Sequence, residues 1–345
     1  MKNFAYQRPG TLADAVRMLA DHPDWQVLAG GTTMVDLLKL DVIAPAGVVD
    51  ITGIRELQGH DVGAGRIRFG ALARMADVAD DKALQAACPA LSESLWKAAS
   101  PQLRHAARLG GNVLQRTRCP YFRDTSYACN KRLPGSGCAA LDGGSTHLHA
   151  ILGGSAQCVA MYPGDWAQAL IAFDAVVTAS SVNGSRRIAF ADLHRLPGDR
   201  PDLELNLQPG EIVTQIEVPI SAPMKASHYL KARDRQSYAF AAVSAAVGIQ
   251  MSGNEVADVR IALGGVAAKP WRASAAEASL RRKPFDEAAA REAGRIAFQD
   301  AKPLEGSAHK IALGADVVAG ALMTAHRRAL NPSAAATPDF GFPKR

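Results

Sequence analysis

Residues 25–40 read WQVLAGGTTMVDLLKL, and this stretch decides how the chain begins to fold. Its apolar start, Trp25 to Ala29, predicts a short β-strand, and apolar residues recur at helical spacing from Met34 onwards. Between them, residues 30–33 read GGTT. Glycines at a strand-to-helix junction let the backbone approach an anion, and the two threonines can cap the helix or donate to a phosphate. The alternative is a plain tight turn with a threonine cap, because the spacing matches neither GxGxxG nor Walker A.

The stretch belongs to a small α/β unit over the first 55 residues. Residues 11–20 predict an amphipathic helix with Thr11 as its N-cap, and residues 48–51 predict another strand. A second pattern follows, with a strand at 66–72 and a helix at 91–99. The helical run breaks at Ser100-Pro101, because proline disfavours helical geometry in the residue before it. A second glycine loop, LGGNV, is expected at 109–113.

The later part of the chain returns to regular patterns. Strands are expected at 174–178 and 212–218, and the composition changes around 219–223 (PISAP), which marks a domain boundary. Residues 239–250 and 255–263 predict paired strands, and residues 285–327 predict helix. The last fifteen residues, 331–345, read as a tail.

Composition narrows the class of protein. A chain of 345 residues with 48% hydrophobic and 21% charged residues is typical of a globular protein of two to three domains. The longest apolar stretch, 239–249, is much shorter than the roughly 20 residues of a membrane helix, so we expect no membrane insertion. The net charge is +6, yet most cations are dispersed and aromatic residues make up only 6%, which argues against nucleic-acid binding. Only the region from Arg104 to Arg132 concentrates Arg and Lys, against the single acid Asp124.

That basic region overlaps a segment without periodicity, residues 114–157, which is rich in glycine and cysteine. Four thiols gathered by such a segment can hold zinc or an iron–sulfur cluster. No C-x2-C pair is present, which counts against zinc fingers, and disulfides or unligated thiols remain alternatives. The candidate metal ligands are Cys119, Cys129, Cys138 and Cys158.

The residues near these cysteines fit a cluster. A four-thiolate cluster is anionic, and neighbouring cations would offset its charge and raise its reduction potential. His147 and His149 could add ligands, but four cysteines suffice, so both are interpreted as solvated loop residues and Cys88 as a buried structural thiol. The candidate cations are Arg116, Arg118, Arg123, Lys131 and Arg132.

Several of these segments together resemble the FAD-binding subunit of the xanthine-oxidase-type molybdenum hydroxylases. LAGGTTMVDLLKL (28–40) and ARLGGNVLQRTRCPYFRDT (107–125) are similar to the two FAD pyrophosphate loops of that family. CNKRLPGSGCAAL (129–141) resembles the branch with a [4Fe-4S] cluster in this subunit, of the periplasmic aldehyde oxidoreductase type. YPGDWAQALIAFDAVV (162–177) and LGGVAAKPWRA (263–273) resemble further family segments.

The resemblance implies an α+β fold with two domains. Residues 1–222 would form a two-lobed FAD-binding domain of the PCMH (vanillyl-alcohol-oxidase-like) type, with subdomains 1–55 and 56–222 and a cluster loop at about 114–160. Residues 223–330 would form the C-terminal α+β domain of the molybdenum-hydroxylase flavoproteins, with a small antiparallel sheet.

The resemblance also implies site residues. Arg108 stands where the family often has Thr or Ser, Gly164 replaces the usual serine before Asp165, and His105 stands where Asn is usual. Tyr238 is expected near the flavin ring, whereas Lys231 on its own would be interpreted as a solvated strand-end lysine. No catalytic residue is implied. The implied FAD-binding residues are Gln26, Val27, Leu28, Ala29, Gly30, Gly31, Thr32, Thr33, Met34, Arg108, Gly111, Asn112, Asp165, Val213 and Lys231.

The implied function is electron transfer. The chain would carry FAD and a [4Fe-4S] cluster in a heterotrimeric aldehyde oxidoreductase, with a large molybdenum-cofactor subunit and a small subunit holding two [2Fe-2S] clusters. The alternatives are a self-sufficient FAD oxidase or dehydrogenase and a zinc-containing nucleic-acid-binding protein. The start MKNFAYQRPG lacks the apolar core of a signal peptide. We therefore expect a cytoplasmic protein, or a periplasmic complex exported on a partner's twin-arginine signal.

Overall fold

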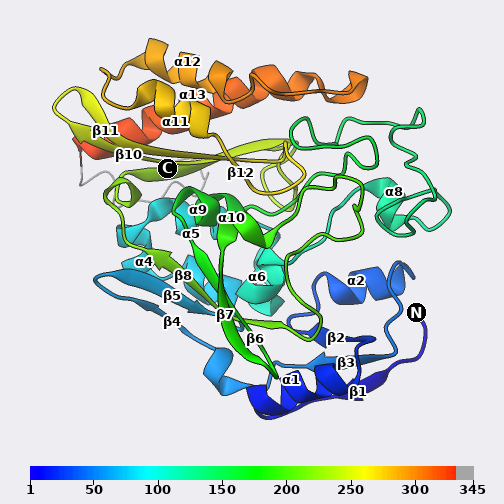
Figure 1. Ribbon diagram of the computed structural model, residues 1–345. Helices are drawn as coiled ribbons and strands as arrows, with labels where there is room; N and C mark the ends of the chain where they lie inside the picture. Colours follow the sequence, from blue (N-terminus) through cyan, green and yellow to red (C-terminus); the bar gives the residue numbers. More distant parts are fainter. Residues whose placement is uncertain (332–345) are drawn as a thin grey trace.

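Three separate sheets and the helices that cover them make up the computed structural model, which describes residues 1–331. In Figure 1 the N-terminal sheet lies at the bottom, a five-stranded sheet in the middle and the C-terminal sheet above, with helices on top. The mixture of helices and sheets and the antiparallel C-terminal sheet confirm the expected α+β class. Of the predicted tail, residues 332–345 lie outside the described residues.

The N-terminal unit is a parallel three-stranded sheet of order β1-β3-β2. The Thr11 side chain accepts a hydrogen bond from the Asp14 backbone N–H, which confirms the predicted N-cap. The predicted strand–glycine–helix sequence is also confirmed, because β2 leads through residues 29–33 into α2. The elements are β1 (Ala5–Gln7), α1 (Leu12–Asp21), β2 (Trp25–Leu28), α2 (Met34–Lys39) and β3 (Gly47–Asp50), followed by the 3-10 turn η1 (Arg55–Leu57).

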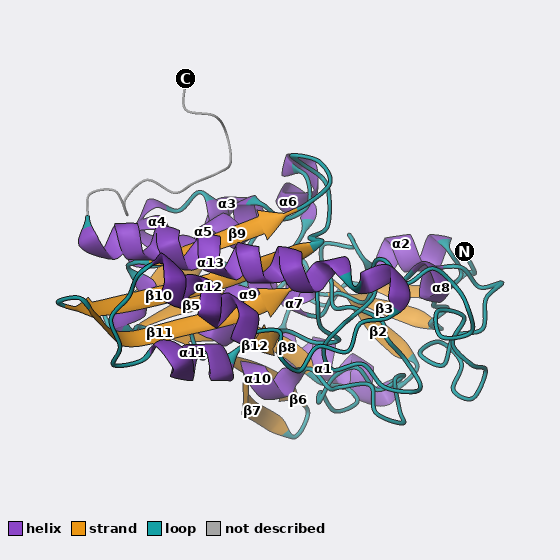
Figure 2. Cartoon of the chain, turned by 90° about the horizontal axis from the view of Figure 1, so that it is seen from above, coloured by secondary structure: helices purple, strands orange, loops and turns teal. Residues whose placement is uncertain are grey.

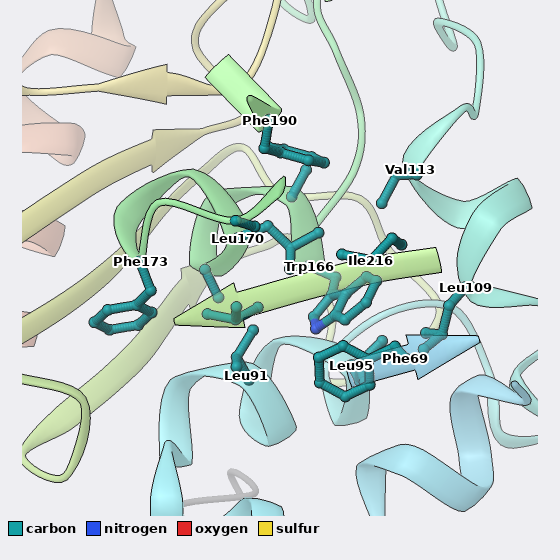
Figure 3. Packing of buried hydrophobic residues seen from close by; sticks show 14 of the residues in the cluster. Phe69, Leu91, Leu95, Leu109, Val113, Trp166, Leu170, Phe173, Phe190 and Ile216 are labelled. Carbon is teal, nitrogen blue, oxygen red and sulfur yellow. The ribbon is translucent and has the colours of Figure 1, made fainter. Parts of the chain in front are cut away.

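The middle unit is an antiparallel sheet of order β4-β5-β8-β6-β7. Its inner face packs on helices around Trp166, which meets the Phe69 ring edge-on at 5.2 Å between ring centroids. Figure 3 shows Ile216 and Leu170 in the same packed core. The strands are β4 (His60–Val62), β5 (Arg66–Gly70), β6 (Val176–Ser181), β7 (Gly184–Ala189) and β8 (Ile212–Pro219); the helices are α3 (Met75–Ala79), α4 (Lys82–Ala87), α5 (Pro89–Trp96), α6 (Pro101–Ala106), α9 (Trp166–Ala172) and α10 (Phe190–Leu193).

The second glycine segment differs from the prediction. Residues 109–113, expected as a loop, form the one-turn helix α7 (Leu109–Val113), closed by the Asn112 N–H donating to the Arg108 carbonyl at 2.8 Å. A Cβ on Gly110 would stand 2.8 Å from the Cβ of Ala71. Glycine therefore lets this turn pack directly on the end of β5, and tertiary packing overrides the low helix propensity of a Gly-Gly pair.

The C-terminal unit is an antiparallel sheet of order β12-β11-β10-β9 covered by helices. Figure 2 shows α13 lying over the sheet, where it packs on β10, with α12 packed on α13. The predicted paired strands are confirmed, and the predicted helical region is interrupted between α12 and α13. The elements are η2 (Ala222–Met224), β9 (Ser227–Ala232), β10 (Val243–Ser252), β11 (Glu255–Gly264), β12 (Trp271–Arg272), α11 (Ser274–Leu280), α12 (Glu287–Ile296), η3 (Glu305–Ser307) and α13 (His309–Leu330).

A buried ionic network joins the middle and C-terminal units. The Glu93 carboxylate on α5 accepts from Arg328 Nη2 of α13 at 2.6 Å and lies 2.8 Å from His228 Nδ1 of β9. Glu93 is fully buried and Arg328 is 5% exposed. These partners hold the pKa of Glu93 at about 2 although burial alone would raise it. The two units therefore share a desolvated, paired charge rather than a solvated hinge.

The segment between α7 and α9 is irregular, as its sequence predicts, apart from the short helix α8 (Pro120–Arg123). Figure 1 shows it on the right of the molecule, beside α8 and above α2. Within residues 1–331, none of the helices combines the length and apolar character needed to span a bilayer. Cys88 is fully buried in the middle unit, as predicted.

Candidate cofactor sites

The two glycine segments line one pocket. Its walls come from β2, the loop into α2, the start of α7 and the start of β8, so it lies between the N-terminal and middle units. We call it the glycine pocket. The predicted residues that line it are Gln26, Val27, Ala29, Gly30, Gly31, Thr32, Thr33, Met34, Arg108, Gly111 and Val213.

The glycines in this pocket have different structural roles. A Cβ on Gly30 would stand 2.2 Å from the Ala106 carbonyl oxygen, so Gly30 lets the two units approach each other. Gly31 has a φ of +71°, which an L side chain rarely adopts. Nothing lies within 4 Å of the Cβ position of Gly111, so its backbone faces open space in the pocket. The pocket thus presents bare backbone on both sides, as a diphosphate requires.

The threonines differ from the capping prediction. Thr33 stands at the N-cap of α2, but its backbone is already helical (φ −109°, ψ −47°) and its side chain makes no capping hydrogen bond. An N-cap side chain reaches the helix N–H groups from an extended backbone, which Thr33 lacks. Both Thr32 and Thr33 line the pocket.

Two arginines add positive charge to the glycine pocket. Arg108 lines it, and its pKa is lowered chiefly by burial and then by Arg74. Arg116, interpreted from sequence as a neighbour of the cysteines, lines the glycine pocket instead and pairs with Glu204. The closeness of Arg116 in sequence to the second glycine pair could have indicated this position. The nearby cysteines suggested a role beside a metal cluster instead. Cations here suit an anionic ligand such as a dinucleotide.

Four of the implied FAD residues lie outside the glycine-pocket lining as the structure describes it: Leu28, Asn112, Asp165 and Lys231. Asp165 and Lys231 form their own buried cluster, with Nζ 2.8 Å from Oδ2, and the Tyr229 hydroxyl donates to the other Asp165 oxygen at 2.5 Å. The Lys231 side chain is 1% exposed, so the interpretation as a solvated lysine was wrong. Asn112 donates from Nδ2 to Met75 Sδ at 3.5 Å.

Two other residues named from the resemblance lie on the surface. Tyr238 is 55% exposed on the loop between β9 and β10, and His105 is exposed on α6. Tyr238 has a φ of +53°, and its carbonyl accepts from the Arg235 guanidinium. Neither belongs to the lining of the glycine pocket.

The four clustered cysteines line a second, small cavity of about 10 Å³, which we call the cysteine pocket. Cys119 precedes α8, Cys129 and Cys138 face each other in an isolated antiparallel bridge, and Cys158 lies on the returning chain. Within the described part of the chain each of these is a free thiol. Burial raises the pKa of Cys119 to about 12, so metal binding there must displace its proton.

Within the described residues, the cysteine pocket supplies sulfur donors without a formed single-ion site. Among residues 1–331, no three His, Cys, Asp or Glu side chains converge closely enough to hold one metal ion. An iron–sulfur cluster of this kind takes four cysteine thiolates as its ligands. Four free thiols around one small cavity supply the ligand number and type that such a cluster requires.

His149, considered from sequence as an extra ligand and then interpreted as a solvated loop residue, lies at the cysteine pocket. It is 2% exposed, lines the cysteine pocket, and places Nε2 3.3 Å from Cys119 Sγ. Its pKa is lowered to about 4, first by burial and then by Lys310, so the ring is neutral near pH 7. The interpretation as a solvated histidine was wrong for His149, whereas His147 is exposed and pairs with Ser145.

The basic residues of the segment mostly anchor it. Arg118 and Arg123 both bind the Asp36 carboxylate of α2, at 2.7 and 2.8 Å, and Arg132 donates to the Tyr121 and Phe122 carbonyls. Only Lys131 of the predicted cations lines the cysteine pocket. Most of these cations therefore hold the irregular segment in place. Of the five predicted to offset the charge of a cluster, Lys131 is the one that lies at the cysteine pocket.

Comparison with known proteins agrees with this arrangement. Residues 2–221 match the family described as the FAD binding domain in molybdopterin dehydrogenase, and residues 227–325 match the CO dehydrogenase flavoprotein C-terminal domain. The chain is 45% identical over 282 residues to the aldehyde oxidoreductase FAD-binding subunit PaoB of Escherichia coli (strain K12), covering 81% of this chain and 86% of that protein.

More distant relatives also match most of the chain. The glyceraldehyde dehydrogenase medium chain of Sulfolobus acidocaldarius is 28% identical over 82% of this chain and 83% of its own. The crystallised carbon monoxide dehydrogenase of Hydrogenophaga pseudoflava superposes with a TM-score of 0.74 at 25% identity, covering 95% of this chain and 98% of that one. With two family matches and these relatives, the chain belongs to the FAD-binding medium subunits of the molybdenum hydroxylase oxidoreductases.

Proposed function

We propose that the chain is the electron-transfer subunit of a heterotrimeric, molybdenum-dependent aldehyde oxidoreductase, carrying both FAD and a [4Fe-4S] cluster. The observation that carries the proposal is the gathering of four free cysteines around one cavity in a chain that also has the family's FAD domain. The similarity to an aldehyde oxidoreductase subunit supports the aldehyde as substrate class.

The partners follow from the same proposal. A large subunit with the molybdenum cofactor would hydroxylate the aldehyde, and a small subunit with [2Fe-2S] clusters would pass the electrons to FAD in this chain. Bound FAD supplies the capacity to take up electrons singly and to release one or two. The external acceptor then receives them from this subunit.

The chain's own residues would hold the FAD by its diphosphate. The backbone at Gly31 and Gly111 faces the pocket, and the Thr32 and Thr33 hydroxyls line it beside Arg108. Neutralising a diphosphate in a partly buried pocket requires donors and cations that are already in place. Fixed backbone N–H groups and a half-buried arginine meet that need without a large rearrangement.

The two pockets are neighbours. Arg116 of the glycine pocket and Lys131 of the cysteine pocket both bind Glu204, Lys131 at 3.0 Å. A third cavity of about 360 Å³ shares Arg116 with the first pocket and Lys131 and Cys158 with the second. The two candidate cofactor sites are therefore adjacent, and closeness of the cofactors suits exchange of electrons within one subunit.

Metal and flavin analysis of strictly anaerobic preparations tests the proposal. We expect one FAD and about four irons per chain, from the four-cysteine cluster stoichiometry, with a broad absorbance near about 400 nm that bleaches on reduction. The isolated chain should not turn over aldehydes, whereas the complex should. Iron-free protein, or zinc in place of iron, would refute the cluster, and aldehyde turnover by the isolated chain would favour a self-sufficient flavoenzyme.

A further inference from the structure

The imidazole of His149 faces the sulfur of Cys119 inside the cysteine pocket. Nε2 stands 3.3 Å from Sγ, within hydrogen-bond distance for sulfur, and the side chain is 2% exposed. The other ring nitrogen, Nδ1, is buried and has no hydrogen-bond partner within the described residues. Burying an imidazole with one unpartnered nitrogen costs free energy. That cost is offset only if the contact of the other nitrogen with the sulfur is stabilising.

The surroundings fix the ring rather than leave it to find this contact by chance. The His149 N–H donates to the Thr146 carbonyl at 2.9 Å, and its carbonyl accepts from Lys310 Nζ of α13 at 3.1 Å. The ring stacks on Tyr121, with 5.9 Å between centroids and 23° between planes. Backbone, lysine and aromatic ring together aim Nε2 at Cys119.

This geometry decides the tautomer once Cys119 is a thiolate. A thiolate sulfur accepts hydrogen bonds and has no proton to donate, so Nε2 must carry the ring proton and Nδ1 must be the bare nitrogen. Nδ1 has no hydrogen-bond partner within the described residues, which fits this assignment because an unpaired acceptor is tolerated better than an unpaired N–H. The direction of the bond is therefore from His149 to the sulfur.

We propose that His149 donates its Nε2–H to the Cys119 thiolate and thereby raises the reduction potential of the cluster. The inference rests on the [4Fe-4S] cluster of the proposed function. Reduction adds a negative charge that spreads onto the thiolate sulfurs, and a donor aimed at one sulfur stabilises the reduced state more than the oxidised one. His149 is thus a tuning residue that acts through a ligand and not itself a ligand.

Redox titration of the holo-complex, followed by EPR of the reduced cluster, tests the proposal. His149→Phe keeps a flat ring on Tyr121 but removes the donor, and His149→Gln keeps an N–H. We expect a lower cluster potential in His149→Phe, a potential closer to wild type in His149→Gln, and an unchanged FAD potential in both. His147→Phe, two residues away and exposed, is the matched control and should shift nothing.

A second measurement does not depend on how the variants fold. In wild-type protein with ¹⁵N-labelled histidine, pulsed EPR of the reduced cluster should show one weak ¹⁵N coupling, typical of a hydrogen-bonded nitrogen. A strong coupling would make His149 a ligand, and no coupling would remove it from the cluster; either result overturns the inference. Equal potentials in His149→Phe and wild type overturn it as well.

The outcomes also separate the two proposals. Wild-type protein without iron ends the cluster assignment and the role of His149 together. Wild-type protein with about four irons per chain and no effect of His149 on potential or coupling ends only the tuning role. Loss of iron in both His149 variants would show structural support in place of tuning, and this too contradicts the inference.

Discussion

The glycine pocket and the cysteine pocket are built on opposite principles. The first is framed by the ends of β2, α2, α7 and β8, and its key positions are backbone conformations that packing already fixes. The second is framed by a segment with one short helix, whose path is set by side chains bound to distant carbonyls and carboxylates. The comparison teaches that a binding site can be preorganised by the fold or by a set of anchors added to it.

The consequence is a difference in what each pocket tolerates. A change in the glycine pocket meets backbone atoms that cannot move without moving a sheet or a helix. A change in the cysteine pocket meets a loop held by Asp36, Glu204 and Lys310, each of which can be removed separately. We therefore expect FAD and iron contents to respond independently to substitutions, which the following experiments examine in order of expected size.

The largest effect is expected from Cys129→Ser. Cys129 is 8% exposed and packs against Phe122 in the cysteine pocket, and a serine oxygen is a poor ligand for a cluster that needs four thiolates. We expect essentially complete loss of iron with the FAD content unchanged, measured by metal and flavin analysis of the same sample. Cys88→Ala, outside the pocket, is the control and should keep both cofactors. Joint loss of iron and FAD in Cys129→Ser would contradict the expected independence of the two pockets.

Glu93→Gln tests the fold that both pockets share. It leaves Arg328 and His228 in a buried site without their anion, and breaking a buried pair in this way costs about 3–5 kcal/mol. Denaturant unfolding of the two proteins should show that loss, with FAD and iron contents nearly normal under native conditions. Glu287→Gln, an exposed helix pair, is the control and should change the free energy of unfolding by less than about 1 kcal/mol.

The same pair predicts a pH dependence. The pKa of Glu93 is about 2 in the folded protein, below its ordinary value of about 4.3. The stabilisation is therefore complete above the unfolded-state pKa and is lost as the pH falls towards 2. The difference in unfolding free energy between wild type and Glu93→Gln should shrink below about pH 4. A difference that stays constant down to pH 2.5 would argue against this assignment.

Gly30→Ala tests the glycine pocket, whose shape is fixed by the packing of the fold. The added Cβ would stand 2.2 Å from the Ala106 carbonyl oxygen, and overpacking of this kind costs about 1–3 kcal/mol. If that strain falls on the pocket, FAD should bind about ten- to a hundred-fold more weakly. Fluorescence titration of the deflavinated protein measures it, with iron content as the internal reference. Gly10→Ala, with open space around its Cβ position, should bind FAD normally.

The smallest effect is expected from Asp36→Asn, which weakens one anchor of the cysteine segment. Bonds to Arg123 and charges on Arg118 hold the pKa of Asp36 below its ordinary value, but the carboxylate is 34% exposed, so its loss costs about 1 kcal/mol or less. We expect modestly faster iron loss to a chelator, with FAD retained. In wild type the same acceleration should appear as the pH falls through the lowered pKa, where the carboxylate is protonated. Asp316→Asn on α13 is the surface control.

The sequence predicted what local chemistry determines. The strand–glycine–helix start, the Thr11 cap and the paired strands at 239–263 each depend on neighbours within a few residues, and the structure confirms them. The one-turn helix α7 was not predictable, because it forms on Ala71, which lies far away in the sequence.

The site shows the same limit. The sequence predicted that the four cysteines gather, because they lie close together in the chain and a loop that turns back is enough to bring them to one place. The burial of His149 depends on Lys310, more than a hundred residues later, and the pairing of Asp165 with Lys231 depends on how two units meet. The residues themselves were named from the sequence, but their burial and their partners were not predictable, because those partners lie far away in the chain.

The lysine at position 310 has a consequence for how the protein is made. Its ammonium, 1% exposed, binds the carbonyls of His149 and Gly265, so a late helix completes a wall that begins with Cys119. Until α13 is synthesised, those two carbonyls lack this donor. Under the proposed function, iron insertion is therefore expected only after the chain is complete through α13.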